Sequence, residues 1–206
     1  MKNNFIFTTM LTVSMLLASC GSHNGEATNK TSEKLRSIIS DETTTTQTIY
    51  GKIQGYKDGN IYTFKGIPYA KAERFMPPQE PDKFEDIKIC RIYGPKAPQT
   101  TTTLEWTGDK ESDYAFGNNF VLEENCLVLN IWTQGLNDGK KRPVFVWFHG
   151  GGFSSGSGHD LPCYEGRALA AKGDIVVVTI NHRLNVLGYL DLSGAGGKLA
   201  ESTNLG

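Results

Sequence analysis

Two uninterrupted apolar runs in the second half of the chain restrict its fold more than any other feature. Val144–Phe148 and Ile175–Val178 contain no polar residue, which is typical of strands that are buried on both faces of a sheet. Between them, Glu165–Lys172 is a helix-forming stretch that is followed by Gly173, a common helix stop. The order strand, helix, strand predicts a βαβ unit with two parallel strands. We therefore expect an α/β protein.

The preceding segments indicate β-structure of another kind. Thr48–Ile53 and Ile61–Phe64 are short β-prone runs, and the turn sequence Asp58-Gly59-Asn60 between them predicts an antiparallel hairpin. Leu127–Trp132 alternates in the manner of a strand. Residues 77–124 show little regular pattern, and so long a loop is usually functional or contains missed elements. We expect a short antiparallel hairpin that leads into a mostly parallel sheet.

The first twenty residues are predicted to be a targeting segment. Lys2 precedes an apolar run, Phe5–Leu17, which is too short and too interrupted to span a membrane and is typical of a signal peptide. The run ends in Leu17-Ala18-Ser19-Cys20, which resembles the bacterial lipobox, in which the cysteine carries lipid. We expect an exported lipoprotein of the bacterial cell envelope, anchored to the membrane through Cys20. An ordinary signal peptide and a buried N-terminal helix are the alternatives.

A polar stretch separates this segment from the β-prone runs. Residues 21–47 have little apolar periodicity and include the threonine run Thr43–Thr46, a composition typical of a flexible tether. The expected organisation is therefore a lipoprotein signal peptide at 1–20, a tether at 21–47 and a folded part at 48–206.

The composition argues against several classes of protein. The chain has 21 Lys and Arg residues against 22 Asp and Glu residues, with a formal net charge of −1. A polybasic nucleic-acid binder carries a large positive excess, so we expect no nucleic-acid partner. Four cysteines in 206 residues are too few for a disulfide scaffold, and the absence of a C-x-x-C pair argues against a zinc ribbon and a thioredoxin-type site.

A glycine run follows the first apolar run directly. His149-Gly150-Gly151-Gly152-Phe153 leaves backbone N–H groups uncovered by side chains and permits positive φ angles. At the carboxyl end of a strand, such a loop can direct two N–H groups at one developing oxyanion. A plain glycine-rich turn is the alternative. The spacing matches neither a P-loop nor G-x-G-x-x-G, and we expect no cofactor and no metal.

Six blocks of sequence, in a fixed order, resemble the type-B carboxylesterases, a family of the α/β-hydrolase fold that includes the cholinesterases. The blocks are Gly66–Ala70 with Arg74-Phe75, Gly94–Gln99, Glu124–Trp132, Pro143–Phe153, Asn181–Arg183 with Leu187–Leu190, and Asn204–Gly206. The resemblance covers residues 48–206 and implies the N-terminal part of such a domain. It implies hydrolysis of a small carboxylic ester by a serine, a histidine and a carboxylate. It assigns the oxyanion hole to the N–H groups of Gly151 and Gly152, with Gly150 as a candidate helper.

The nucleophile, the acid and the base of this mechanism are expected beyond residue 206. The local match to G-x-S-x-G at Gly152–Gly156 overlaps the glycine run, so we do not expect Ser154 to be the nucleophile. The stretch alone is therefore expected to be inactive. The rival hypothesis is a non-catalytic, envelope-anchored binding or adhesion module of the same superfamily.

The resemblance also implies structural roles. Arg74 and Glu124 match positions that form a buried ion pair, and two separate surface charges are the alternative. Cys126 matches a family cysteine whose disulfide partner is replaced here by Ala97. That disulfide therefore cannot form, and Cys90 is a candidate substitute.

The histidines do not match the catalytic base of the family. His149 precedes the glycines and is expected to orient the loop, whereas His182 stands where the family has tyrosine and is expected to be structural. A metal site made by His149, His159 and Cys163 is conceivable, but its spacing fits no familiar ligand pattern.

Overall fold

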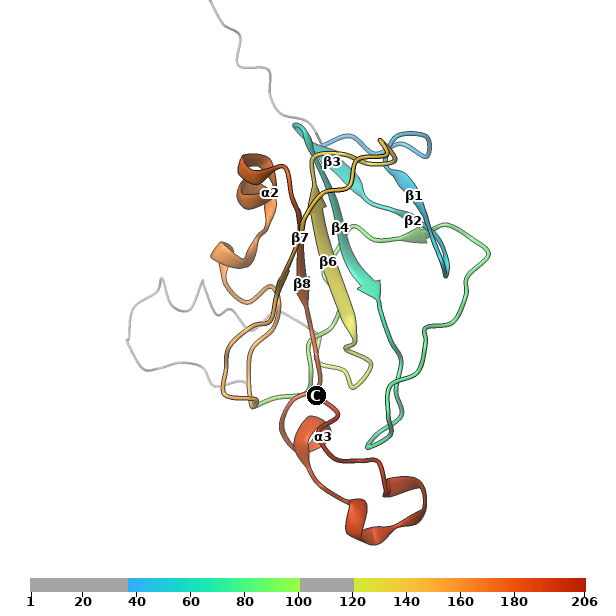
Figure 1. The fold of residues 1–206 in the computed structure, drawn as a ribbon, viewed down its shortest axis with the longest axis vertical. Coiled ribbons are helices and arrows are strands. Elements are labelled where there is room, and N and C mark those ends of the chain that lie inside the picture. Colours follow the sequence, from blue (N-terminus) through green and yellow to red (C-terminus); the bar gives the residue numbers. More distant parts are fainter. Residues whose placement is uncertain (1–36, 101–120) are drawn as a thin grey trace, which may run out of the picture. The chain divides into compact units, whose positions relative to one another are not determined.

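A five-stranded sheet forms the centre of the structure, a computed structural model that describes residues 37–100 and 121–206 (Figure 1). In spatial order, its strands are β3 (Tyr56–Asp58), β4 (Ile61–Pro68), β6 (Val128–Thr133), β8 (Val176–Ile180) and β7 (Val144–Trp147). These strands belong to one compact unit, residues 35–206. The expected signal peptide, Cys20 and most of the expected tether lie outside the described residues.

A smaller sheet covers part of one face of the large sheet. Its strands are β1 (Thr45–Thr48), β2 (Gly51–Gln54) and β5 (Lys88–Ile89), in that order. Ile53 of β2 packs with Phe64 and Cys90 in a buried cluster, against which Ile131 of β6 also packs. The two sheets therefore share a core on the face that carries Ile131.

Helix α2 (Arg167–Gly173) covers the opposite face (Figure 1). Its Ala170 is buried against Trp132 and Val177, and Trp132 points away from Ile131 because successive strand residues face opposite sides. Helix α3 (Asn185–Tyr189) follows β8 at its carboxyl end. Three 3₁₀ turns complete the described elements: η1 (Pro162–Tyr164), η2 (Ser193–Ala195) and η3 (Gly197–Leu199).

The predicted βαβ unit is confirmed. Strand β7, helix α2 and strand β8 follow one another, and β7 pairs with β8 in parallel, from Val144↔Val176 to Trp147↔Thr179. The expectation of a mostly parallel sheet requires a correction for this part of the chain. The pairs β3–β4, β4–β6 and β6–β8 are all antiparallel, so among the described residues the large sheet is parallel only at β7–β8.

The predicted hairpin exists, but one of its strands was wrongly assigned. β4 pairs with β3 across the two-residue connection Gly59-Asn60, whereas β2 pairs with β1 in the smaller sheet. The chain passes from one sheet to the other at Gly55, where a Cβ atom would collide with the carbonyl oxygen of Thr63. Only glycine fits at this close approach of the two backbones, which marks the point where the chain leaves one sheet for the other.

The fold also begins earlier than the expected boundary at residue 48. Thr44 is fully buried, Ile38 forms an antiparallel bridge with Lys57, and β1 starts at Thr45. The β-branched threonines at the end of the polar stretch suit a strand that pairs with β2. The last part of the expected tether therefore belongs to the folded unit.

Strand β7 departs from the expectation of burial on both faces. All four of its side chains are exposed, and Phe148 beyond it is 66% exposed. The reason is its position: β7 is an edge strand, and within the described ranges β8 is its only partner. An apolar edge strand of this kind is a surface on which further structure can pack.

Candidate functional site

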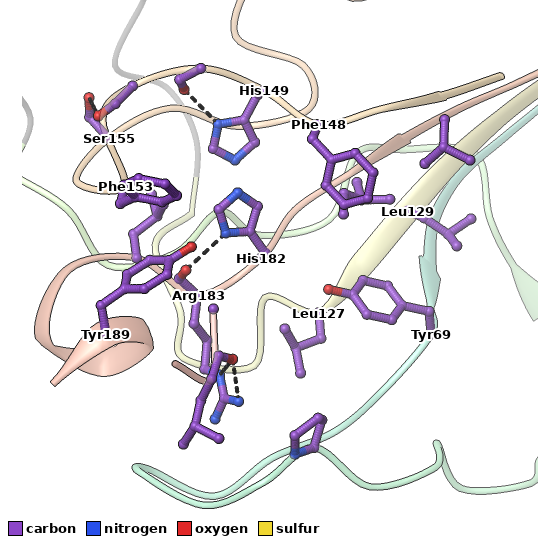
Figure 2. Close-up of a pocket in the computed structure, with 18 of the residues that line it drawn as sticks. Tyr69, Leu127, Leu129, Phe148, His149, Phe153, Ser155, His182, Arg183 and Tyr189 are labelled. Atoms are coloured by element: carbon purple, nitrogen blue, oxygen red, sulfur yellow. Dashed lines mark hydrogen bonds between the residues drawn. The ribbon is translucent and has the colours of Figure 1, made fainter. Parts of the chain in front are cut away.

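A hollow of about 750 Å³ lies at the carboxyl ends of β7 and β8 (Figure 2). The loop after β7 and the segment between β8 and α3 form two of its walls. Most of its lining is apolar and includes Leu127, Leu129, Phe148, Phe153, Leu184 and Tyr189. In α/β sheets, ligands bind beyond the carboxyl ends of parallel strands, which makes this hollow the candidate site.

The glycine run adopts a backbone that other residues would resist. Gly151 has a φ of 128° and Gly152 a φ of 61°, in the region that L-residues rarely adopt. A Cβ atom at Gly151 would also collide with the carbonyl of Ser155. Gly150 differs, because its φ is not positive and a Cβ atom there would meet nothing within 4 Å. The backbone therefore requires glycine at position 151, favours it at 152 and does neither at 150.

The loop uses its carbonyl groups and leaves N–H groups available. The carbonyl oxygen of Gly151 accepts hydrogen bonds from the N–H groups of Ser154 (3.1 Å) and Ser155 (3.2 Å). The N–H groups of Gly151 and Gly152, by contrast, donate no hydrogen bond to any described residue. Two adjacent backbone donors at the rim of an apolar hollow can receive an anionic oxygen.

Gln99 holds the end of the loop in place, a role that we did not predict. Its Oε1 accepts a hydrogen bond from the N–H of Gly156 (2.7 Å), and its Nε2 donates to the carbonyl of the same residue (3.0 Å). The carbonyl of Phe153 accepts from the N–H of Asn185 at 2.9 Å. The only sequence signal for Gln99 was its place at the end of the block Gly94–Gln99.

Two further contacts support the segment behind the loop. Asn181 accepts from the N–H of Gly158 through Oδ1 (2.8 Å) and donates to the carbonyl of Pro95 through Nδ2 (2.8 Å). Lys96 and Asp160 form a largely buried ion pair of 2.9 Å. The blocks that resembled the family thus meet around one loop, although they are far apart in the sequence.

Two histidines stack against each other beside the hollow (Figure 2). The ring centroids of His149 and His182 are 4.6 Å apart and the planes differ by 15°. Each Nδ1 contacts a backbone carbonyl, that of Gly150 at 2.8 Å and that of Arg183 at 3.0 Å. A carbonyl only accepts, so each Nδ1 carries the hydrogen. Burial is the largest cause that lowers the pKa of His149, which favours its neutral form.

Ser154 does not occupy a nucleophile elbow. Such an elbow needs a strand that runs directly into the turn and a helix that leaves it directly. Here β7 ends at Trp147, α2 begins only at Arg167, and the Oγ of Ser154 donates to the carbonyl of Gly151 at 3.1 Å. The hydroxyl therefore takes part in the turn of the loop.

Arg74 and Glu124 lie in direct contact. The Nε of Arg74 donates to both carboxylate oxygens of Glu124, at 2.9 and 3.0 Å, and this contact is the largest cause that lowers the pKa of Glu124. The expectation of a buried pair is wrong for this structure, because 63% of the Arg74 side chain is exposed. Solvent therefore screens the attraction between the two charges.

The cysteines form no disulfide among the described residues. Cys90, Cys126 and Cys163 are free thiols. Cys126 is buried in one cluster with Ala97, whereas Cys90 belongs to another. The proposed substitution of Cys90 as the partner of Cys126 is therefore not found.

The structure does not bring the three residues of the conceivable metal site together as a cluster. Within residues 37–100 and 121–206, no group of three or more His, Cys, Asp or Glu side chains is placed to hold a metal ion. His159 instead stacks on Tyr93, with centroids 4.5 Å apart, and burial lowers its pKa to about 4.

The sequence of the chain matches the model of the Carboxylesterase family over residues 41–199, which is most of its length. The chain belongs to the carboxylesterase family. The match also begins before residue 48, in agreement with the early start of the fold. The α/β-hydrolase fold and the family resemblance of the sequence blocks are thus confirmed.

Similar proteins include several esterases. Para-nitrobenzyl esterase of Bacillus subtilis is 37% identical over 163 residues, which are 77% of this chain and 31% of that protein. Phenmedipham hydrolase of Pseudarthrobacter oxydans is 37% identical over 152 residues, 69% of this chain and 28% of that protein. A solved esterase of Clostridium hathewayi is 40% identical, with a TM-score of 0.74 over 83% of this chain and 34% of its own. This chain spans about a third of the length of these relatives.

Proposed function

We propose that the protein hydrolyses carboxylic esters, and that the N–H groups of Gly151 and Gly152 form its oxyanion hole. The observation that carries this proposal is the pair of backbone donors without an acceptor at the carboxyl end of β7. Membership of the carboxylesterase family supports it. Gly150 is a weaker candidate for a helper, because its backbone does not require glycine.

In this reaction, a serine hydroxyl attacks the ester carbonyl carbon while a histidine takes its proton. The carbonyl oxygen becomes an oxyanion, which the two N–H groups stabilise until the alcohol leaves with the proton from the histidine. Water then releases the acid by the same steps. The serine, the histidine and the carboxylate that orients it are proposed to follow downstream, since the serine of the one local G-x-S-x-G match, Ser154, does not occupy an elbow.

The walls of the hollow suggest the kind of ester. Phe148, Phe153 and Leu184 line the hollow beside the glycine loop with apolar surface. Binding is favoured when this surface and the hydrocarbon or aromatic groups of a substrate are removed from water together. We therefore propose small esters with apolar substituents as substrates. Among the relatives, the Clostridium hathewayi esterase can hydrolyse aliphatic aromatic polyesters.

The test compares glycine substitutions in the full-length protein with a chromogenic short-chain ester. Gly151→Ala should lower kcat about 10²–10³-fold with little change in KM, because its Cβ atom would collide with the carbonyl of Ser155 and displace one oxyanion donor. The control is Gly194→Ala, since a Cβ atom there meets nothing within 4 Å and its φ is not positive. Wild-type kcat for Gly151→Ala, in a protein with an unchanged melting temperature, would refute the oxyanion role.

Two further comparisons separate the alternatives. Residues 21–206 alone should show no turnover, and Ser154→Ala should not alter the activity of the full-length protein beyond its effect on folding. If the full-length protein binds esters without hydrolysing them, the binding-module hypothesis is favoured instead.

We also propose that Cys20 carries lipid and holds the protein at the bacterial cell envelope. The support is the sequence Leu17-Ala18-Ser19-Cys20 after an apolar run. None of the helices in the described part of the chain is long and apolar enough to cross a membrane. Metabolic labelling with a palmitate analogue should mark the wild type and should fail with Cys20→Ala; an unlabelled wild type would refute the anchor.

A further inference from the structure

We propose that His182 is a positioning residue for the glycine loop, which acts through the ring of His149 and sets the direction of the Gly151 N–H. This inference rests on the proposed function, because it assigns a support to the same oxyanion loop. It adds a role for a residue that replaces the tyrosine of the family motif.

The first step is the geometry of one peptide unit. The carbonyl of Gly150 and the N–H of Gly151 belong to the same planar peptide and point in opposite directions. His149 donates from Nδ1 to that carbonyl at 2.8 Å. A fixed carbonyl therefore fixes the N–H of Gly151, although His149 never contacts that donor.

The second step is what holds the ring of His149. Gly156 lies close to it, since a Cβ atom on Gly156 would approach Nδ1 to 2.6 Å. The ring also stacks on His182, with centroids 4.6 Å apart and planes that differ by 15° (Figure 2). The close approach of Gly156 and the stack on His182 together restrict the ring.

The third step is what holds His182. It follows β8, the parallel neighbour of β7, so the ends of two paired strands bring the rings together. Its own Nδ1 contacts the carbonyl of Arg183 at 3.0 Å, which orients its ring. Arg183 in turn is buried and donates to the carbonyls of Met76 and Leu205. The support of the loop therefore extends into the rigid part of the fold.

A further observation fits this arrangement. The Nε2 atom of His149 is buried and has no hydrogen-bond partner among the described residues. The hydrogen of a neutral histidine can sit on either ring nitrogen. In His149 the Gly150 carbonyl and the restricted position of the ring keep it on Nδ1. If the stack is lost, the ring can turn and Gly150 is released.

The test uses two apolar substitutions in the full-length protein that differ in one property. His182→Phe keeps a flat ring for the stack, whereas His182→Leu has comparable bulk without one. With an ester substrate, His182→Leu should lower kcat about tenfold and leave KM within about twofold, since one donor is misdirected and not removed. His182→Phe should keep kcat within about threefold of the wild type.

A spectroscopic readout makes the result independent of esterase activity. In protein with ¹⁵N-labelled histidine, the nitrogen shifts of His149 should show the Nδ1–H tautomer in the wild type and in His182→Phe. His182→Leu should show a mixture of tautomers. Equal kcat values for the two variants, or an unchanged tautomer in His182→Leu, would overturn the positioning role. If the wild type lacks esterase activity while the tautomers behave as expected, the proposed function fails and the positioning role stands.

Discussion

The side-chain oxygen of Asn130 accepts a hydrogen bond of 3.0 Å from the backbone N–H of Gly66, 64 residues earlier in the chain. Gly66 lies where the register between β4 and β6 shifts, so its N–H is not paired by the regular ladder. The Nδ2 of Asn130 also donates to the Oγ1 of Thr179 in β8 at 3.0 Å. One buried side chain thus joins three neighbouring strands.

We expect Asn130→Leu to lower the free energy of unfolding by about 2–4 kcal/mol. The change leaves the N–H of Gly66 and the hydroxyl of Thr179 buried without their partner, and each such group costs roughly 1–3 kcal/mol. Urea unfolding followed by circular dichroism measures the difference. The matched control is Asn60→Leu, which removes an exposed hydrogen bond to Gln134. Equal losses for the two variants would contradict the assignment.

Arg183 is expected to be irreplaceable by lysine. Its Nε donates to the carbonyl of Leu205 (2.9 Å) and its Nη1 to that of Met76 (2.8 Å), and a lysine ammonium cannot reproduce this planar fork. Arg183→Lys should therefore lower the free energy of unfolding by about 2–4 kcal/mol. Arg74→Lys is the comparison, because the Arg74 side chain is exposed and its variant should melt close to the wild type. A larger loss of unfolding free energy for Arg74→Lys than for Arg183→Lys would show that burial of the guanidinium does not determine the cost of the substitution.

The thiols should differ sharply in reactivity. Burial raises the pKa of both Cys90 and Cys126 to about 11. At pH 8 only about one part in a thousand of such a thiol is the reactive thiolate, and the fraction rises about tenfold with each pH unit until it nears that pKa. Cys163 is exposed. In a Cys20→Ser variant, Cys163 should be the one described thiol that reacts with Ellman's reagent before denaturation, and all three described thiols should react afterwards. Rapid reaction of all three in the native protein would disprove the burial of Cys90 and Cys126.

Ala97→Cys is expected to create a disulfide with Cys126. Both residues are buried in the same cluster, and the closed loop would remove entropy from the unfolded chain worth about 3–4 kcal/mol. Mass spectrometry should show the loss of two hydrogens in Ala97→Cys and no such loss in the double variant Ala97→Cys, Cys126→Ser. A variant that retains both thiols under oxidising conditions would show that the Cβ atoms are badly placed.

The sequence predicted the elements whose signals are local. The apolar runs and the helical stretch gave the βαβ unit correctly, and the motif blocks gave the family. The sequence could not predict which strand pairs with which: β2 was assigned to the hairpin because nothing local shows that Gly55 is pressed against Thr63. The exposure of β7 could not be predicted either, because an apolar run such as Val144–Phe148 does not reveal whether the strand has a neighbour on both sides.

The site was predictable in its backbone and less so in its supports. The glycines are evident in the sequence, and their type permits the positive φ that is found at Gly151 and Gly152. The contacts of Gln99 with Gly156 and of His149 with His182 join residues distant in sequence. No single-sequence pattern encodes such contacts, and only the family blocks suggested where to look.

Because β7 lies at the edge of the sheet, its apolar composition does not imply slow amide exchange. Strand β8 is paired on both sides, by β6 and by β7, so its amide groups are held in ladders on either flank. In β7, only the amides that face β8 are paired within the described structure, and the alternate amides are open to water. In residues 21–206 on their own, amide hydrogen exchange should therefore find the slowest positions in β8, whereas every second amide of the wholly apolar strand β7 takes up deuterium as fast as a loop.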